Sequence, residues 1–151
     1  MHPSSRVASR RRAVNTKERH ERMSVCLEAL KLENSHTPVL VEGVRDEQAL
    51  RRLGLEGQII IYNSGQSLGA TADALARKHK RMIVLFDWDR TGGHLVKRLT
   101  EHLHAQIDLD LTYRKEFAIV SQVRCVEDLP AAARLIEDRA GSGPGEDLGI
   151  E

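Results

Sequence analysis

Residues 82–93 read MIVLFDWDRTGG, an apolar run followed by two aspartates one residue apart and then by two glycines. If the chain stays extended, Asp87 and Asp89 face the same side. At about 4 Å and an effective dielectric constant near 20, two such charges repel by roughly 4 kcal/mol. Solvent, a partner cation or a metal ion has to offset this repulsion. The stretch is therefore a candidate site as well as a candidate strand.

This apolar run is the last of three short segments that read as buried strands. The earlier two are Val39–Val41 and Ile59–Ile61, and the third is Met82–Phe86. Helical patterns lie between and after them, over residues 46–53, where Gly54 ends the helix, then from Leu68 to Ala76, and through Leu95, Leu99 and Leu103. A weaker, edge-like fourth strand is expected over residues 107–111. Such alternation predicts an α/β fold with a parallel sheet, in which ligands bind beyond the carboxyl ends of the strands.

The chain divides into a central core and flanking segments. Residues 37–111 are expected to form the core. An N-terminal helix is expected over 15–36, begun by a capping box at Asn15 and Glu18. A helical extension is expected over 112–138, and the two ends, 1–14 and 139–151, are expected to be a disordered basic arm and a disordered acidic tail.

The net charge of +1 hides an asymmetry between the two ends of the chain. Residues 1–22 hold seven basic and two acidic residues, a net charge of +5, whereas residues 137–151 hold one basic and five acidic residues, a net charge of −4. A basic arm favours a polyanionic partner such as nucleic acid. Only five residues are aromatic, so an extended base-stacking platform is not expected.

The sequence predicts a cytoplasmic protein without a membrane segment. No apolar run approaches the 18 residues that a spanning helix needs, and the basic N-terminus lacks the apolar stretch of a secretory signal. Cys26 and Cys125 fit no metal-binding spacing. We interpret them as reduced, buried thiols.

Acidic residues follow two of the predicted strands. Glu42 ends the first strand, and Asp87 and Asp89 follow the third. If these strands are neighbours, the three carboxylates converge at one sheet edge, and such a group suits Mg²⁺, which prefers oxygen ligands. Asp46, at the start of the next helix, is either a further acid of this site or a helix cap. Gly92 lets the backbone approach the site, beside a helix N-terminus that can face an anion.

The segments VLVEGVRDEQAL, residues 39–50, and LFDWDRTGG, residues 85–93, resemble the Toprim domain of topoisomerases, primases and some nucleases. That family has a Glu-Gly pair after its first strand and an Asp-x-Asp motif after its third. The resemblance is strongest to small stand-alone archaeal Toprim proteins, which are related to the ribonuclease that matures 5S ribosomal RNA. It implies a three-layer, Rossmann-like fold with a short, mainly parallel four-stranded sheet flanked by helices.

The resemblance also implies roles for individual residues. Glu42 would be a general acid or base, or a metal ligand, and Asp87 and Asp89 would bind Mg²⁺. Asp46 matches an acid of the nuclease-like members. The residues expected to contact substrate or shape its groove are Arg45, Asn63, Ser64, Gly65, Arg90 and Gly92.

These observations favour a Mg²⁺-dependent phosphodiester enzyme that acts on nucleic acid. Within that class, an RNA-processing nuclease is favoured. A non-catalytic module that binds nucleic acid or a protein partner is the main alternative, because a fold alone does not establish activity. A third reading rests on Asp87, Asp89 and Thr91, which match the Asp-x-Asp-x-Thr motif of haloacid-dehalogenase-type phosphatases. That family, however, places the motif on its first strand.

Overall fold

The protein has an α/β fold with a central four-stranded sheet, seen in a computed structural model that describes residues 15–62, 67–103 and 106–141. The sheet has the order β2-β1-β3-β4, and all three pairings are parallel. The fold class predicted from the sequence is confirmed. Along the chain the elements are α2 (Thr16–Asn34), β1 (Val39–Val41), α3 (Val44–Arg52), β2 (Ile59–Ile61), α4 (Leu68–Lys78), β3 (Arg81–Val84), α5 (Arg90–Leu103), β4 (Asp108–Asp110), α6 (Thr112–Val120), the 3₁₀ turn η1 (Val126–Asp128) and α7 (Leu129–Gly141).

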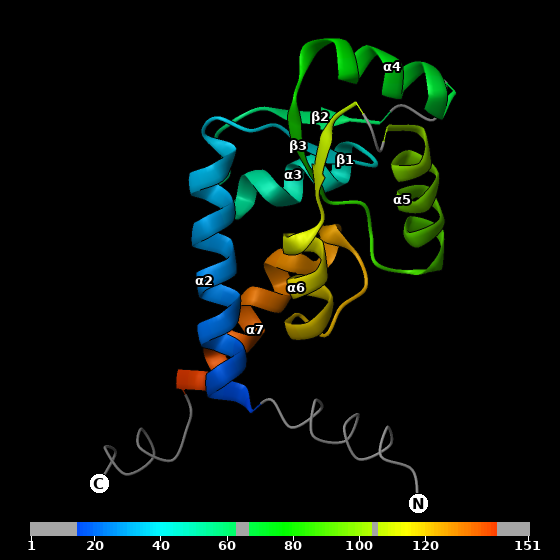
Figure 1. Ribbon diagram of the computed structural model, residues 1–151. Coiled ribbons are helices and arrows are strands. Elements are labelled where there is room, and N and C mark those ends of the chain that lie inside the picture. The colour runs from blue at the N-terminus through cyan, green and yellow to red at the C-terminus, as the bar shows by residue number, and fades with distance from the viewer. Residues whose placement is uncertain (1–14, 63–66, 104–105, 142–151) are drawn as a thin grey trace, which may run out of the picture.

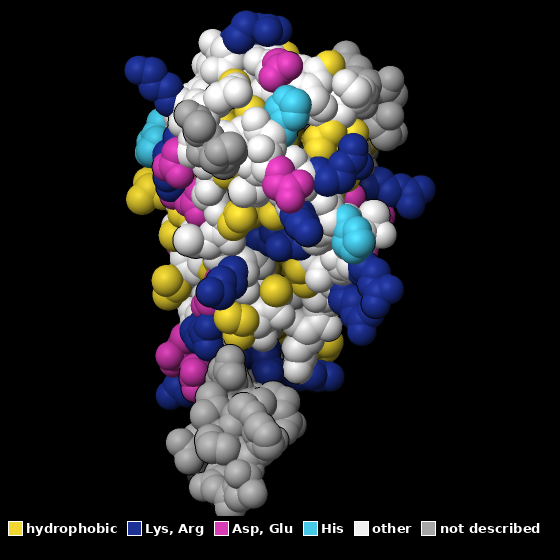
Figure 2. Space-filling view, turned by 45° about the vertical axis from the view of Figure 1, so that its right-hand side comes forward, with side chains coloured by type: hydrophobic (Ala, Val, Ile, Leu, Met, Phe, Trp, Pro, Cys, Tyr) yellow, Lys and Arg dark blue, Asp and Glu magenta, His cyan; other side chains and the backbone are white. Residues whose placement is uncertain are grey.

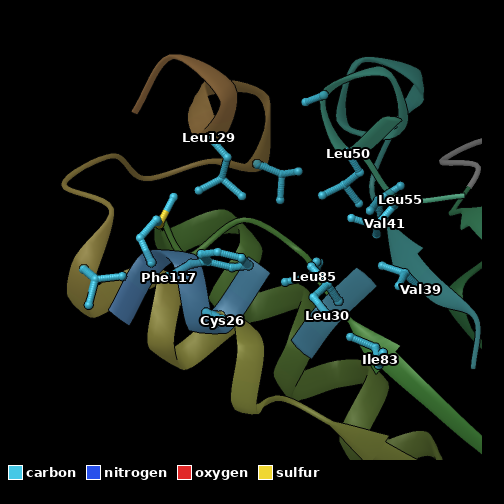
Figure 3. Packing of buried hydrophobic residues seen from close by; sticks show 14 residues of the cluster. Cys26, Leu30, Val39, Val41, Leu50, Leu55, Ile83, Leu85, Phe117 and Leu129 are labelled. Carbon is cyan, nitrogen blue, oxygen red and sulfur yellow. The ribbon is translucent and has the colours of Figure 1, made fainter. Parts of the chain in front are cut away.

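The strands alternate their side chains between two helical layers. Val39 and Val41 of β1 pack in one core cluster with α2, α3, α6 and α7, whereas Leu40 packs in a second cluster with α4 and α5. Figure 1 shows α4 and α5 on the side of the sheet away from α2, α6 and α7. Figure 3 shows side chains of the first cluster pointing toward one another, among them Leu30, Phe117 and Leu129. The sheet is thus the middle of three layers, as predicted.

The register sets the position of the candidate site. Leu40 of β1 pairs with Val84 of β3, and the Leu85 N–H donates to the Leu40 carbonyl at 2.8 Å. The two strands are therefore neighbours and end at the same edge of the sheet. Residues that follow β1 and β3 must lie close together there.

Several element boundaries differ from the prediction. The helix expected over 46–53 begins at Val44, with Gly43 as its N-cap. Asp46 lies in the first turn, and its carboxylate caps the helix by accepting the Gly43 N–H at 3.1 Å. Gly54 follows this helix with a φ of +106°, a left-handed conformation that glycine adopts easily. Helix α7 runs to Gly141, into the stretch expected to be tail. The basic arm and residues 142–151 lie outside the described residues.

The N-terminal helix begins where the sequence indicated. The Asn15 side chain accepts the Glu18 N–H at 2.8 Å, and Met23, Cys26 and Leu30 are buried. Cys26 is thus a buried thiol, as predicted, and burial raises its pKa to about 12; Cys125 is only half-buried. Among the described residues, no helix has the length and apolar composition to cross a membrane.

An ion-pair cluster joins the first residue of β3 to α2 and β4. The Arg81 guanidinium donates to Glu33 at 2.7 Å, to Asp108 at 2.6 Å and to Asp110 at 2.7 Å. Asp110 is buried, and its other oxygen accepts the N–H of Thr112 at the start of α6. The cluster ties the N-terminal helix and α6 to the sheet.

Candidate metal and phosphoryl-transfer site

Four carboxylates from three segments meet at the carboxyl ends of β1 and β3. Glu42 directly follows β1, Asp46 lies in the first turn of α3, and Asp87 and Asp89 lie in the loop between β3 and α5. The charges of the other three all act on Asp87. The structure therefore brings together the acids that the sequence placed at this edge.

Each carboxylate holds a backbone N–H of the surrounding loops. Glu42 accepts the N–H of Asp87 at 2.7 Å, which links the ends of the two strands directly. Asp87 in turn accepts the N–H of Val126 at 2.9 Å, and Asp89 accepts the N–H of Gly92 at 2.7 Å. In these three cases the hydrogen bond uses one of the two carboxylate oxygens.

Burial and nearby like charges raise the pKa of three of the four acids, Glu42, Asp46 and Asp87. The pKa of Asp87 is raised to about 6, first by burial and then by the charges of Glu42, Asp46 and Asp89. The pKa of Glu42 is also raised, again by burial first, although the hydrogen bond from the Asp87 N–H opposes the change. Nearby like charges raise a carboxyl pKa because they disfavour its ionised form. A cation bound between the acids would relieve this repulsion.

The acids fit Mg²⁺ by chemistry, although their side chains do not form a closed metal cage. All the donors are carboxylate oxygens, the ligand type that Mg²⁺ prefers. Within the described ranges, no group of three His, Cys, Asp or Glu side chains is placed to hold a metal ion. One oxygen of each carboxylate accepts a backbone N–H instead. Metal ligation therefore requires the free oxygens, or a rotation of these side chains.

Gly92 is required by a close backbone approach, whereas Gly43 is not. A Cβ atom at Gly92 would lie 1.8 Å from the Asp87 carbonyl oxygen, a distance that no side chain could tolerate. At Gly43 a Cβ atom would meet nothing within 4 Å. Gly92 thus shapes the loop that carries the two aspartates. The space at Gly43 is open.

Arg114 of α6 holds the same loop and was not predicted from the sequence. Its Nε donates to the Phe86 carbonyl at 2.9 Å, and its Nη2 donates to the Asp87 carbonyl at 2.8 Å. Burial lowers the pKa of its guanidinium, and the charges of Glu42, Asp87 and Asp89 oppose that change. Arg114 is therefore a half-buried cation within electrostatic reach of three of the acids. No motif marks it, because it lies 27 residues beyond Asp87 in the sequence.

The segment between α6 and η1 supports the loop from a second direction. The Trp88 N–H donates to the Arg124 carbonyl at 3.1 Å, and its indole N–H donates to the Val123 carbonyl. The Trp88 ring stacks on Phe117 with ring centroids 6.1 Å apart. Trp88 thus points into the core, while the aspartates on either side of it join the site.

Of the other residues predicted to contact the substrate, two are exposed near the site and three cannot be placed. Arg45 is 83% exposed and lies 3.6 Å from Glu127, so its charge is partly compensated. Arg90 is exposed at the first position of α5, next to Asp89. Asn63, Ser64 and Gly65 lie outside the described residues.

With this fold and this site, comparison with known proteins identifies the family. Residues 37–120 match the Toprim domain, and the chain belongs to the Toprim domain family. Membership makes it a metal-dependent module associated with nucleic acids, of a family that generally binds Mg²⁺ through acidic residues. The matched residues include the Asp87-x-Asp89 motif. The match includes α6 and therefore Arg114.

Small archaeal proteins are similar over most of their length. A UPF0292 protein of Methanocaldococcus jannaschii is 37% identical over 116 residues, which cover 74% of this chain and 90% of that protein. A UPF0292 protein of Thermoplasma volcanium is 34% identical over 99 residues, which cover 65% of this chain and 83% of that protein. The predicted resemblance to small archaeal Toprim proteins is confirmed.

A solved structure shares the fold. A putative protein from Aquifex aeolicus superimposes with a TM-score of 0.61 at 25% identity, over 70% of this chain and 95% of that chain.

Proposed function

We propose that this protein is a Mg²⁺-dependent phosphodiester-cleaving enzyme that acts on nucleic acid, with RNA as the favoured substrate. The observation that carries the proposal is the meeting of Glu42, Asp87 and Asp89 at one sheet edge, where the pKa values of two of them are raised. RNA is favoured because the motifs resemble those of archaeal proteins related to an RNA-maturing ribonuclease. The cytoplasm would then be its place of action.

Asp87 and Asp89, with Glu42, are the residues that would hold Mg²⁺. A bound Mg²⁺ supplies a charge that polarises the phosphoryl group and neutralises the negative charge developing on it. The protein's part is to fix the ligands. Arg114 and the Val126 N–H do this for Asp87 by holding its carbonyl and its carboxylate respectively.

Glu42 is suited to move a proton. Its raised pKa keeps the protonated form present closer to neutral pH than an ordinary glutamate would allow. A carboxyl group in that state can donate a proton to the leaving oxygen of a phosphodiester and take one back from water. This role needs its second oxygen, since the first accepts the Asp87 N–H.

A non-catalytic nucleic-acid-binding or protein-binding module is the second candidate, and a specific observation favours it. The carboxylates all bond to backbone N–H groups, and no metal-holding group of three is assembled among the described residues. Acids that only shape loops would show this arrangement too. The two candidates differ in turnover.

The test is cleavage of an end-labelled pool of structured RNA, single-stranded DNA and double-stranded DNA, with Mg²⁺ and with EDTA. Glu42→Gln and Asp87→Asn remove one charge each at the site. Asp138→Asn removes one from an exposed position on α7 and is the matched control. A variant that lacks residues 1–14 tests whether the basic arm contributes to binding.

Products that need Mg²⁺, appear with the control and are absent from both site variants would support the nuclease. RNA products alone would settle the substrate class. Binding of the pool without any product would favour the non-catalytic module. Products that persist in Asp87→Asn would contradict the assigned site.

A further inference from the structure

The carboxylate site creates an electrostatic problem for the polyanion that it is proposed to bind. Four carboxylates lie together, and one divalent cation and Arg114 do not cancel their combined charge. A nucleic-acid backbone carries one negative charge per phosphate, so it is repelled unless cations lie beside the site. The position of those cations is inferred here on the basis of the proposed function.

Three cations near the carboxylates and the sheet have acidic partners. Arg45 faces Glu127, Arg51 faces Glu47, and Arg81 is shared by three acids. Helix α5 differs. Arg90, Lys97 and Arg98 are exposed, and none of the ion pairs among the described residues involves them.

These three residues lie on the outer side of α5 and begin at the site. The buried face of α5 consists of Gly92, Val96, Leu99 and Leu103. At 3.6 residues per turn, Arg90 and Lys97 point in nearly the same direction, opposite to that face. Arg98 flanks them, and the exposed Glu101 lies on the same side, between Lys97 and Arg98. With a rise of 1.5 Å per residue, Lys97 lies about 10 Å along the axis from Arg90.

Figures 1 and 2 show where α5 and its outer side lie. Helix α5 lies on the right of Figure 1, below the end of α4, with its far side turned away from the rest of the protein. Figure 2 brings that side forward and shows Lys and Arg side chains on it among Asp, Glu and His side chains. We call Arg90, Lys97 and Arg98 the α5 cationic face.

We propose that the α5 cationic face binds the phosphodiester backbone of a nucleic-acid strand and leads it to the carboxylates. Arg90 directly follows Asp89, so a strand that contacts Lys97 and Arg98 reaches the site within about two helical turns. The contacts are to phosphates, which carry no base sequence. Binding along this face is therefore salt-dependent and tolerant of sequence.

The experiment measures equilibrium binding of a fluorescein-labelled 20-nucleotide RNA strand by anisotropy, in EDTA, at several salt concentrations. The test variant is Lys97→Gln with Arg98→Gln. The matched control is Lys115→Gln with Arg134→Gln, which removes two exposed cations from α6 and α7. Binding in EDTA separates this question from cleavage, and Asp87→Asn should bind at least as tightly as the unchanged protein.

We expect the test variant to bind the RNA strand about tenfold more weakly than the unchanged protein at physiological salt. Its slope of log K against log salt should fall by about 1.4, since each phosphate contact on a single strand contributes about 0.7. The control should keep both values. Equal losses in the two variants, an unchanged slope in the test variant, or no binding by the unchanged protein would each overturn the proposal. Tighter binding of an acidic peptide than of RNA would overturn it as well. The cleavage assay decides the proposed function separately.

Discussion

Replacing Arg114 by alanine should loosen the loop that carries both aspartates. The guanidinium bridges two successive carbonyls, those of Phe86 and Asp87, at 2.9 and 2.8 Å. Alanine removes both donors and the positive charge. The two carbonyls then need water as a partner, and the neighbouring carboxylates lose a compensating cation.

The expected cost can be worked from these contacts. Hydrogen bonds that involve a charged group contribute about 1.5–3 kcal/mol each when buried. The side chain is only half-buried, and its burial as a cation has a cost of its own that the variant avoids. Both corrections reduce the sum, so Arg114→Ala should lower the free energy of unfolding by about 2 kcal/mol. For a domain of this size that corresponds to a fall of roughly 4–8 °C in Tm.

Urea unfolding followed by tryptophan fluorescence measures this loss in the free energy of unfolding. The chain has a single tryptophan, Trp88, and it lies in the loop between the two aspartates. Lys115→Ala, at an exposed neighbouring position of the same helix, should change stability by less than about 0.5 kcal/mol. Arg114→Lys should fall between the two, because an ammonium cannot bridge both carbonyls as the planar guanidinium does. Equal stability of Arg114→Ala and Lys115→Ala would refute the role given to Arg114.

Gly92→Ala should destabilise the fold by more than about 3 kcal/mol, because its Cβ would lie 1.8 Å from the Asp87 carbonyl oxygen; an unchanged Tm would contradict that close approach. Gly43→Ala, where the Cβ meets nothing within 4 Å, should cost less than about 1 kcal/mol in the same thermal scan. Asp87→Asn should stabilise the metal-free protein at pH 7.5 but not at pH 4. The reason is that the Asp87 pKa is raised to about 6, so the folded protein loses stability as pH rises from about 4 through 6. The full shift corresponds to about 3 kcal/mol, and solvent screening of a half-buried group reduces the expected gain to about 1 kcal/mol, measured by urea unfolding in EDTA at both pH values. Equal gains at both pH values would contradict the electrostatic cause. Asp110→Ala should cost about 2–3 kcal/mol in urea unfolding, since it removes a buried partner of Arg81, and a loss no larger than that of the exposed Asp138→Ala would show the cluster to be unimportant.

The sequence predicted β1, β2 and β3 well, because they are short apolar runs bounded by breaks; β4 (Asp108–Asp110) is mostly acidic and was expected only as a weaker strand. Val39–Val41 and Ile59–Ile61 form β1 and β2 with the expected limits. The strand expected over Met82–Phe86 has different limits and begins at Arg81. Paired strand ends at Val84, while Leu85 and Phe86 stay buried as the chain turns toward the site. Hydrophobic content reports burial, and it does not mark where a strand stops pairing.

The site residues that could be predicted from the sequence are those that follow a strand. Glu42, Asp87 and Asp89 follow strands and could be placed by the rule that strand ends of a parallel sheet meet. The groups that hold them are different. Arg114 acts through its side chain on two carbonyls, and Val126 acts through a backbone N–H that any residue other than proline has. Such contacts depend on the tertiary fold, so no local sequence pattern predicts them.

Mg²⁺ binding by the carboxylates can be measured by titrating the metal-free protein and following Trp88 fluorescence. Trp88 lies between Asp87 and Asp89, so metal bound to either should change its emission. We expect a saturable change with Mg²⁺ in the unchanged protein and in Asp138→Asn, and none in Asp87→Asn. A flat titration of the unchanged protein, with no heat of binding by calorimetry, would contradict this expectation.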